Sequence, residues 1–180
     1  RRTSEDEFIG INAGSTQYNG LEITLNYNII QSEKINLLFA NSANFNDFKF
    51  KEFVYLENDY SGNQLTGMPK FSFNSNLHLS TSFGFYAYLN YNYVGEIPMR
   101  DDNSIYSEKY HLVNTKIGYR KSISKNIQFD IFLGINNIFN EKYASMLLIN
   151  AGSFGNNAPR YYYPGEPINY YSGFNLKYNF

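Results

Sequence analysis

Apolar and polar side chains alternate along several short stretches of this chain, and the C-terminal stretch shows the pattern most fully. Between residues 170 and 180 the even positions are apolar or aromatic, apart from Ser172. The odd positions between them are mostly polar or glycine. A period of two is that of a β-strand whose two faces meet different surroundings. A tilted strand of about ten residues can cross the hydrocarbon of a bilayer. The alternative, an edge strand of a soluble sandwich, would leave a flat aromatic edge open to aggregation.

The same alternation recurs upstream of the C-terminal stretch. In Leu21–Ile29 every odd position is apolar and every even position is polar. No stretch repeats apolar residues at spacings of three and four between helix caps, so no helix is expected. The pattern therefore predicts an all-β protein built from antiparallel strands. Besides these two stretches, strands are expected at 35–40, 71–80, 83–93, 113–119 and 127–136, with a weaker eighth strand at Phe8–Asn12.

The connections between the expected strands alternate in length. Short polar turns are expected at 31–34, 81–82 and 122–126, and long connections rich in Asn, Gly, Pro and Tyr at 47–69, 96–108 and 137–168. Short polar connections of this kind join the strands of hairpins. In bacterial outer-membrane barrels the periplasmic turns are short and the extracellular loops are long. The alternation therefore predicts a transmembrane β-barrel segment whose C-terminus, Phe180, is periplasmic.

The composition agrees with a membrane barrel. Aromatic residues make up 19% of the 180 residues, with 18 Tyr and 16 Phe, which is more than a globular core of this size needs. The two interfacial belts of an outer-membrane barrel would hold the excess. The mean hydropathy of −0.45 hides a lipid-facing band, because every barrel strand also carries a polar face. No apolar run is long enough for a transmembrane helix.

Charge and cysteine content exclude several classes of function. The formal net charge is −1, so no electrostatic argument favours nucleic acid as a partner. The sequence has no cysteine, which excludes disulfides, thiolate metal sites and cysteine nucleophiles within it. Residues 1–20 lack the basic and apolar regions of a signal peptide, so the sequence is expected to start at a mature N-terminus or midway through a longer chain.

Four segments resemble one family. Gly134–Tyr143, GINNIFNEKY, resembles the N-N-[LI]-F-[DN]-x-x-Y segment near the end of TonB-dependent receptors, the active importers of bacterial outer membranes. Asn12–Gly14 with Asn19–Glu22 resembles the family's N-x-G…G-x-E strand opening, and Tyr60–Pro69 its G-N-x-L-x-G-x-P segment. The ending from Pro164 onward resembles the subgroup that includes ferric-citrate-type receptors. The resemblance covers the chain from about Asn12 to the C-terminus.

This resemblance implies a function as part of a larger protein. A complete receptor has an N-terminal plug with a TonB-contacting box, then a barrel of about 22 strands. Neither plug nor box is found in the sequence, so residues 1–180 are expected to be the C-terminal portion of the barrel, about eight of its strands. The expected function is TonB-dependent import of a scarce nutrient, with an iron chelate of the siderophore or ferric-citrate type as the first candidate. The alternative is a self-contained eight-stranded barrel with a structural or adhesive role.

The family also suggests partners. The TonB energy-transducing complex would act through the plug, and the barrel-assembly machinery would pair with the strand ending at Phe180 by β-augmentation. Outer-membrane lipid and a small chelate complete the expected set, and a surface lipoprotein is a further candidate. Neither a cofactor nor an enzymatic activity is expected, because no Ser/His/Asp arrangement can be argued from the spacing.

Candidate ligand-binding residues lie on the long connections, where a rigid barrel displays recognition groups. Arg100 and Arg160 are predicted to clamp an anionic chelate through forked hydrogen bonds. Five tyrosines of these connections are predicted to stack on a ring-bearing ligand, while an interfacial belt remains their alternative role. They are Tyr60, Tyr106, Tyr161, Tyr162 and Tyr163.

Other polar residues receive structural interpretations. His78 and His111 are interpreted as isolated polar side chains that face the lumen. The pair Asp101 and Asp102 is interpreted as a solvated loop turn rather than a metal site, since no second ligand cluster accompanies it. Asn136 and Asn137 are expected to cap backbone groups through their side chains where strand meets loop, and glycines 14, 62 and 67 to supply turn conformations.

Overall fold

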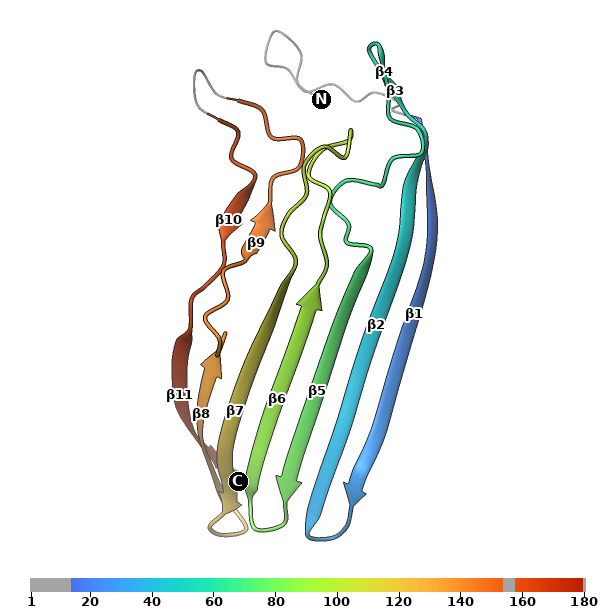
Figure 1. The fold of residues 1–180 in the computed structure, drawn as a ribbon. Helices are drawn as coiled ribbons and strands as arrows, with labels where there is room; N and C mark the ends of the chain where they lie inside the picture. Colours follow the sequence, from blue (N-terminus) through green and yellow to red (C-terminus); the bar gives the residue numbers. More distant parts are fainter. Residues whose placement is uncertain (1–13, 154–157, 180) are drawn as a thin grey trace.

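Seven long strands form one antiparallel sheet in this computed structural model, which describes residues 14–153 and 158–179. The sheet is a meander, because each strand pairs with the long strands before and after it in the chain (Figure 1). The expected all-β antiparallel class is confirmed, and the weaker strand predicted at Phe8–Asn12 lies outside the described residues. In sheet order the strands are β1 (Ser15–Gln31), β2 (Ile35–Glu52), β5 (Phe71–Thr81), β6 (Phe85–Val94), β7 (Tyr110–Ser122), β8 (Ile127–Asn136) and β11 (Asn169–Tyr178).

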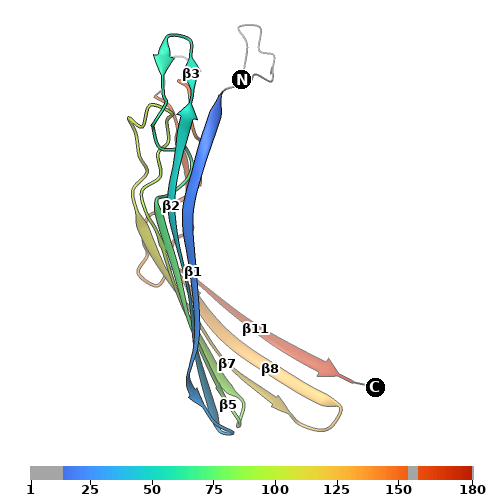
Figure 2. The ribbon, with the colours of Figure 1, turned by 90° about the vertical axis from the view of Figure 1, so that its right-hand side faces the viewer.

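The sheet is open and curved. Strands β1 and β11 lie at opposite ends of the strand order and do not pair with each other. Viewed along its edge, the sheet bends so that β8 and β11 swing away from β1 near the turns (Figure 2). An open, curved, antiparallel meander is the shape of a section of a β-barrel wall.

The connections alternate as predicted. The short turns 32–34, 82–84 and 123–126 lie at one end of the sheet with the C-terminus, and the long loops lie at the other end (Figure 1). The long loops contain two small hairpins that the alternation did not predict. These are β3 (Val54–Tyr55) with β4 (Asn58–Asp59), and β9 (Ala144–Leu147) with β10 (Tyr162–Pro164).

One side of the sheet, called the apolar face from here on, carries the apolar half of each alternating strand. The strand register aligns these residues, as in the row Tyr27–Phe39–Leu77–Leu89 across four strands. Leu21, Ile23 and Leu25 are 57%, 48% and 54% exposed, so no second layer covers them in the described part of the chain. A continuous apolar surface of this kind is suited to contact with lipid hydrocarbon.

The opposite side, called the polar face, carries amides and charged residues. A hydrogen-bonded ladder of amides crosses it, with Asn90 Nδ2 donating to Asn76 Oδ1 at 2.9 Å and Asn114 Nδ2 donating to Asn90 Oδ1 at 3.1 Å. Nearer the short turns, Asp130 accepts hydrogen bonds from Tyr86 and Arg120. The Asp130 carboxylate is largely buried and has both partners, as a carboxylate in a low-dielectric site requires.

Rings and glycines alternate along one row of the polar face. The register places Tyr86, Gly118, Phe132 and Gly173 side by side on four consecutive strands. A Cβ added at Gly118 would overlap the Tyr86 ring, and one at Gly173 would overlap the Phe132 ring. Each ring therefore lies over a glycine on the neighbouring strand, where only hydrogen leaves room for it.

The two histidines lie on different faces. His78 is on the polar face as expected, with its ring 4.6 Å from the Tyr88 ring in an edge-on contact. The prediction for His111 is wrong, because its register partner is Tyr93, on the apolar face. His111 lies near the long-loop end of β7 and stacks on Tyr91 at 6.2 Å. An amphipathic ring suits the boundary between membrane and water, where tyrosines also gather.

Asn41 is a polar residue on the apolar face, and replacing it tests whether that face is apolar in its surroundings. Its register partners are Leu25 and Ser75, and its side-chain Nδ2 and Oδ1 are buried without a hydrogen-bond partner. A buried unpaired amide costs about 1–3 kcal/mol. We expect Asn41→Leu to raise the free energy of unfolding by about that amount in the full-length protein, measured by urea unfolding in lipid vesicles.

The matched control is Asn76→Leu on the polar face. Asn76 donates to Asn74 and accepts from Asn90, so this change should lower the free energy of unfolding. A loss of stability in Asn41→Leu comparable to that in the control would contradict the assignment of faces.

Candidate ligand site at the long loops

The three long loops, 53–70, 95–109 and 137–168, are joined by hydrogen bonds at Asp101. Its Oδ1 accepts from Thr66 Oγ1 at 2.7 Å and from Asn150 Nδ2 at 2.9 Å. Its backbone N–H donates to Asn150 Oδ1 at 3.1 Å. Asp101 and Asp102 do lie in a loop turn, as interpreted from the sequence. Asp101 is only half-exposed, however, and its carboxylate links one side chain from each of the other two loops.

A second set of contacts joins the first and second loops. Asn103 Oδ1 accepts from the Gln64 N–H at 2.7 Å, and Asn103 Nδ2 donates to the Gln64 carbonyl at 2.9 Å. The same two loops bury apolar residues, since Phe53 and Met99 are only 4% and 5% exposed and Pro98 is fully buried. The loops therefore form a packed unit above the barrel wall.

Arg100 meets residues from two other loops. Its guanidinium hydrogen-bonds the Tyr161 side chain and lies 3.4 Å from Asp102 Oδ2, and both contacts raise the pKa of Arg100. Ser104 donates its hydroxyl and backbone N–H to Asp102, which lowers the pKa of that carboxyl with help from Arg100. Tyr60 is close enough to add to the electrostatic stabilisation of Arg100. The positive charge is thus partly balanced within the protein.

A cleft of about 680 Å³ lies between the second and third loops. Tyr106 and Tyr162, two of the predicted ligand residues, both line this cleft, and Tyr143 lines it as well. Glu108, Glu141 and Lys142 add charged residues to its lining. The volume lies within the range of about 300–1,000 Å³ that is usual for small-molecule sites.

The predicted residues thus divide into two groups and one outlier. Arg100 and Tyr161 contact each other, and Tyr106 and Tyr162 line the cleft. Arg160 is exposed and makes no hydrogen bond or ion pair with another described residue. No group of three or more His, Cys, Asp or Glu that could hold a metal ion is found among the described residues.

Asn137 holds the base of the third loop. Its Nδ2 donates to the carbonyls of Glu141 and Glu166 at 2.9 and 3.0 Å, and its Oδ1 accepts from the Glu141 N–H at 2.8 Å. Its own N–H donates to Asn114 Oδ1, the end of the amide ladder. The expected capping role of Asn137 is confirmed, and its φ of 51° is one that asparagine tolerates well.

Tyr143 is a residue of the site that the sequence analysis left without a role. Its ring lies over Gly165, where an added Cβ would overlap it, and 5.0 Å from the Tyr110 ring. The signal was present in the GINNIFNEKY segment, which ends on this tyrosine. Tyr143 thus packs the start of the third loop against its end. The expected positive φ values of Gly14, Gly62 and Gly67 are confirmed.

The family model for the TonB-dependent receptor-like β-barrel matches residues 2–138. The chain belongs to this family. TonB-dependent receptors are transporters and not enzymes. No helix in the described part of this receptor chain is long and apolar enough to cross a membrane.

Solved structures of siderophore receptors have the same fold. The siderophore receptor PiuA from Acinetobacter baumannii is 17% identical, with a TM-score of 0.64 over 90% of this chain and 22% of its own. The ferric yersiniabactin uptake receptor FyuA from Yersinia pestis is 16% identical, with a TM-score of 0.61 over 94% and 24%. The ferric-catecholate import receptor Fiu from E. coli K12 is 16% identical, with a TM-score of 0.63 over 99% and 23%. The chain therefore spans about a quarter of the length of these receptors.

Proposed function

We propose that this chain is the C-terminal part of the barrel of an outer-membrane receptor that imports an iron chelate. The observation that carries the proposal is the two-faced, open sheet of a TonB-dependent receptor-like barrel, with short turns at one end and packed loops at the other. The apolar face would contact lipid, and the polar face would line the lumen. The short turns and the C-terminus would then be periplasmic.

The open edges of the sheet favour this proposal over a self-contained eight-stranded barrel. A small closed barrel requires its first and last strands to pair, whereas in the described part of the chain β1 and β11 lie at opposite edges (Figure 1). The similar receptors are also about four times longer than the matched part of their chains. Both observations support residues 1–180 as one section of a larger barrel.

An iron chelate is the substrate class that the loops and the similar receptors support best. The three similar structures are named as siderophore or ferric-chelate receptors. In this chain Tyr106 and Tyr162 would stack on a ring-bearing chelate in the cleft, and Arg100 with Tyr161 would bind its anionic groups. Arg160 would add a second cation from the exposed part of the third loop.

Partners follow from the same proposal. A plug outside this sequence would contact the TonB energy-transducing complex, and the assembly machinery would recognise the C-terminal strand β11. The predicted terminal residue of that signal, Phe180, lies outside the described part of the chain. A surface lipoprotein above the packed loops is a further candidate partner.

Iron uptake is the direct test. We expect deletion of the complete gene to abolish uptake of at least one radiolabelled ferric chelate under iron limitation, and the wild-type gene to restore it. Tyr106→Ala with Tyr162→Ala should weaken binding of that chelate roughly tenfold, since an aromatic contact contributes about 0.5–1.5 kcal/mol beyond its buried area.

The matched control is Tyr163→Ala. Tyr163 is a half-exposed tyrosine of β10 that the sequence also suggested for stacking but that does not line the cleft. It should leave binding unchanged. Unaltered uptake of every ferric chelate in the deletion strain would refute the proposed substrate class, and equal losses in the control and the double variant would refute the cleft as its site.

A further inference from the structure

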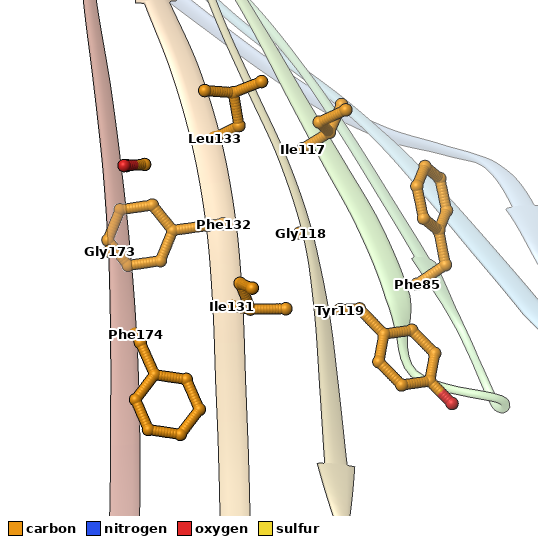
Figure 3. A pocket seen from close by; sticks show the side chains of 10 residues that line it. Phe85, Ile117, Gly118, Tyr119, Ile131, Phe132, Leu133, Gly173 and Phe174 are labelled. Carbon is orange, nitrogen blue, oxygen red and sulfur yellow. The ribbon is translucent and has the colours of Figure 1, made fainter.

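The apolar face contains a hollow near its short-turn end. Its volume is about 600 Å³, and its lining comes from β6, β7, β8 and β11. Figure 3 shows the lining side chains. Ile117 and Leu133 share one row of the register, and Phe85, Tyr119, Ile131 and Phe174 share a second row nearer the short turns. The register explains the hollow, because the row Ala87–Ile117–Leu133–Ser172 has a small side chain at each end.

The glycines at the floor of the hollow are required by aromatic rings on the polar face of the sheet. Gly118 and Gly173 contribute backbone to its lining, and their ring partners Tyr86 and Phe132 lie over them on the polar face. Neither glycine can fill the space from its own strand. The backbone groups of β7 and β8 are paired on both sides, and the outer edge of β11 would pair with a further strand in the proposed larger barrel. The hollow would then offer no free ladder to an extended peptide. Its chemistry suits a hydrocarbon chain.

A single cation marks the end of the hollow that lies toward the short turns. Lys121 is on the apolar face, two residues beyond Tyr119 and opposite Phe129. Its side chain is exposed and makes no ion pair or hydrogen bond with another described residue. On the apolar face of β5, β6, β7, β8 and β11, within their described bounds, Lys121 is the only Lys, Arg, Asp or Glu.

We propose that the hollow binds one acyl chain of a phospholipid from the periplasmic leaflet, with the lipid phosphate at Lys121. An apolar groove that ends in one unpaired cation matches an amphiphile with a hydrocarbon tail and an anionic head. The short-turn end is the periplasmic end in the proposed function, so the leaflet on that side supplies the lipid. This inference rests on the proposed membrane placement and not on the imported substrate.

The test uses the full-length receptor, extracted in mild detergent and examined by native mass spectrometry with added phosphatidylglycerol. We expect the wild type to retain one phospholipid under conditions that remove the others. Lys121→Gln should weaken retention about fivefold, since one lysine near an anionic lipid surface contributes about 1 kcal/mol. Ser172→Trp should abolish retention by filling the hollow.

Lys177→Gln, on the polar face of β11, is the control that should leave retention unchanged. Heat-modifiable electrophoretic mobility confirms that each variant is folded, and Lys121→Gln decides the outcome if Ser172→Trp does not fold. Equal retention in wild type and Lys121→Gln, an equal loss in Lys177→Gln, or preference for lipopolysaccharide over phospholipid would overturn the proposal. None of these outcomes depends on iron uptake, so failure of the substrate assignment would be seen separately.

Discussion

Asn137→Ala is expected to lower the free energy of unfolding of the third-loop base by about 3–5 kcal/mol, because several partly buried backbone groups lose their partners at once. Asn137 is 3% exposed, and its side chain alone satisfies the carbonyls of Glu141 and Glu166 and the N–H of Glu141. Alanine would also have to adopt the positive φ at this position, which it tolerates less well than asparagine. Amide hydrogen exchange in residues 138–145 measures the effect directly.

A neighbouring asparagine is the matched control. Asn136 Nδ2 donates one hydrogen bond, to Asn169 Oδ1 at 2.9 Å. Asn136→Ala should therefore cost about 0.5–1.5 kcal/mol and leave exchange in the third loop close to that of the wild type. Since the cleft residues Tyr143 and Tyr162 lie on this loop, Asn137→Ala should also weaken chelate binding. Similar exchange in both variants would show that Asn137 does not hold the loop base.

Gly134→Val is expected to lower the free energy of unfolding of the full-length receptor by about 2–3 kcal/mol, as overpacking of a well-filled site does. Gly134 is buried beneath the Tyr171 ring, and an added Cβ would overlap that ring. The ring cannot move without leaving its contact with Phe132, where the ring centroids lie 6.2 Å apart. Urea unfolding in lipid vesicles measures the change.

A double-mutant cycle separates the ring contact from a general intolerance of valine. In the Tyr171→Ala background the ring is absent, so the further change Gly134→Val should cost much less than in the wild type. Gly152→Ala is the steric control, since a Cβ at Gly152 would meet nothing within 4 Å. Additive losses in the cycle would contradict the ring-over-glycine packing.

The strands within the membrane band were predictable because an alternation with a period of two can be recognised in a short stretch of sequence. The alternation in Leu21–Ile29 predicts the two faces by itself, and β1 keeps that phase from Leu21 to Asn28, where a bulge shifts the register. The outer half of β2 was predicted as loop because its pattern inverts. There, Phe48 and Phe50 occupy polar-face positions while Asp47 and Lys49 point the other way and form an ion pair. A strand that continues beyond the bilayer meets water on its outer side, so polar residues replace apolar ones there.

The candidate site was predictable in its location but not in its contacts. Arg100, Tyr106 and Tyr161 were found because they lie on long connections between strands. The residues that join the loops could not be found this way, since the bonds of Asp101 reach residues 35 and 49 positions away in the chain. Such pairings depend on how the loops pack around Phe53 and Met99, which no local period encodes.

The two faces of the sheet are tested most directly by spin labels at adjacent residues of β1. The sequence has no cysteine, so Ile23→Cys and Thr24→Cys each place a single nitroxide within it. In lipid vesicles the label at residue 23 should be relaxed strongly by oxygen, which concentrates in the bilayer, and weakly by a water-soluble nickel chelate. The label at residue 24 should show the opposite preference or be shielded from both. Equal oxygen accessibility at the two positions, or a reversed order, would contradict a sheet with one side on lipid and the other on the lumen.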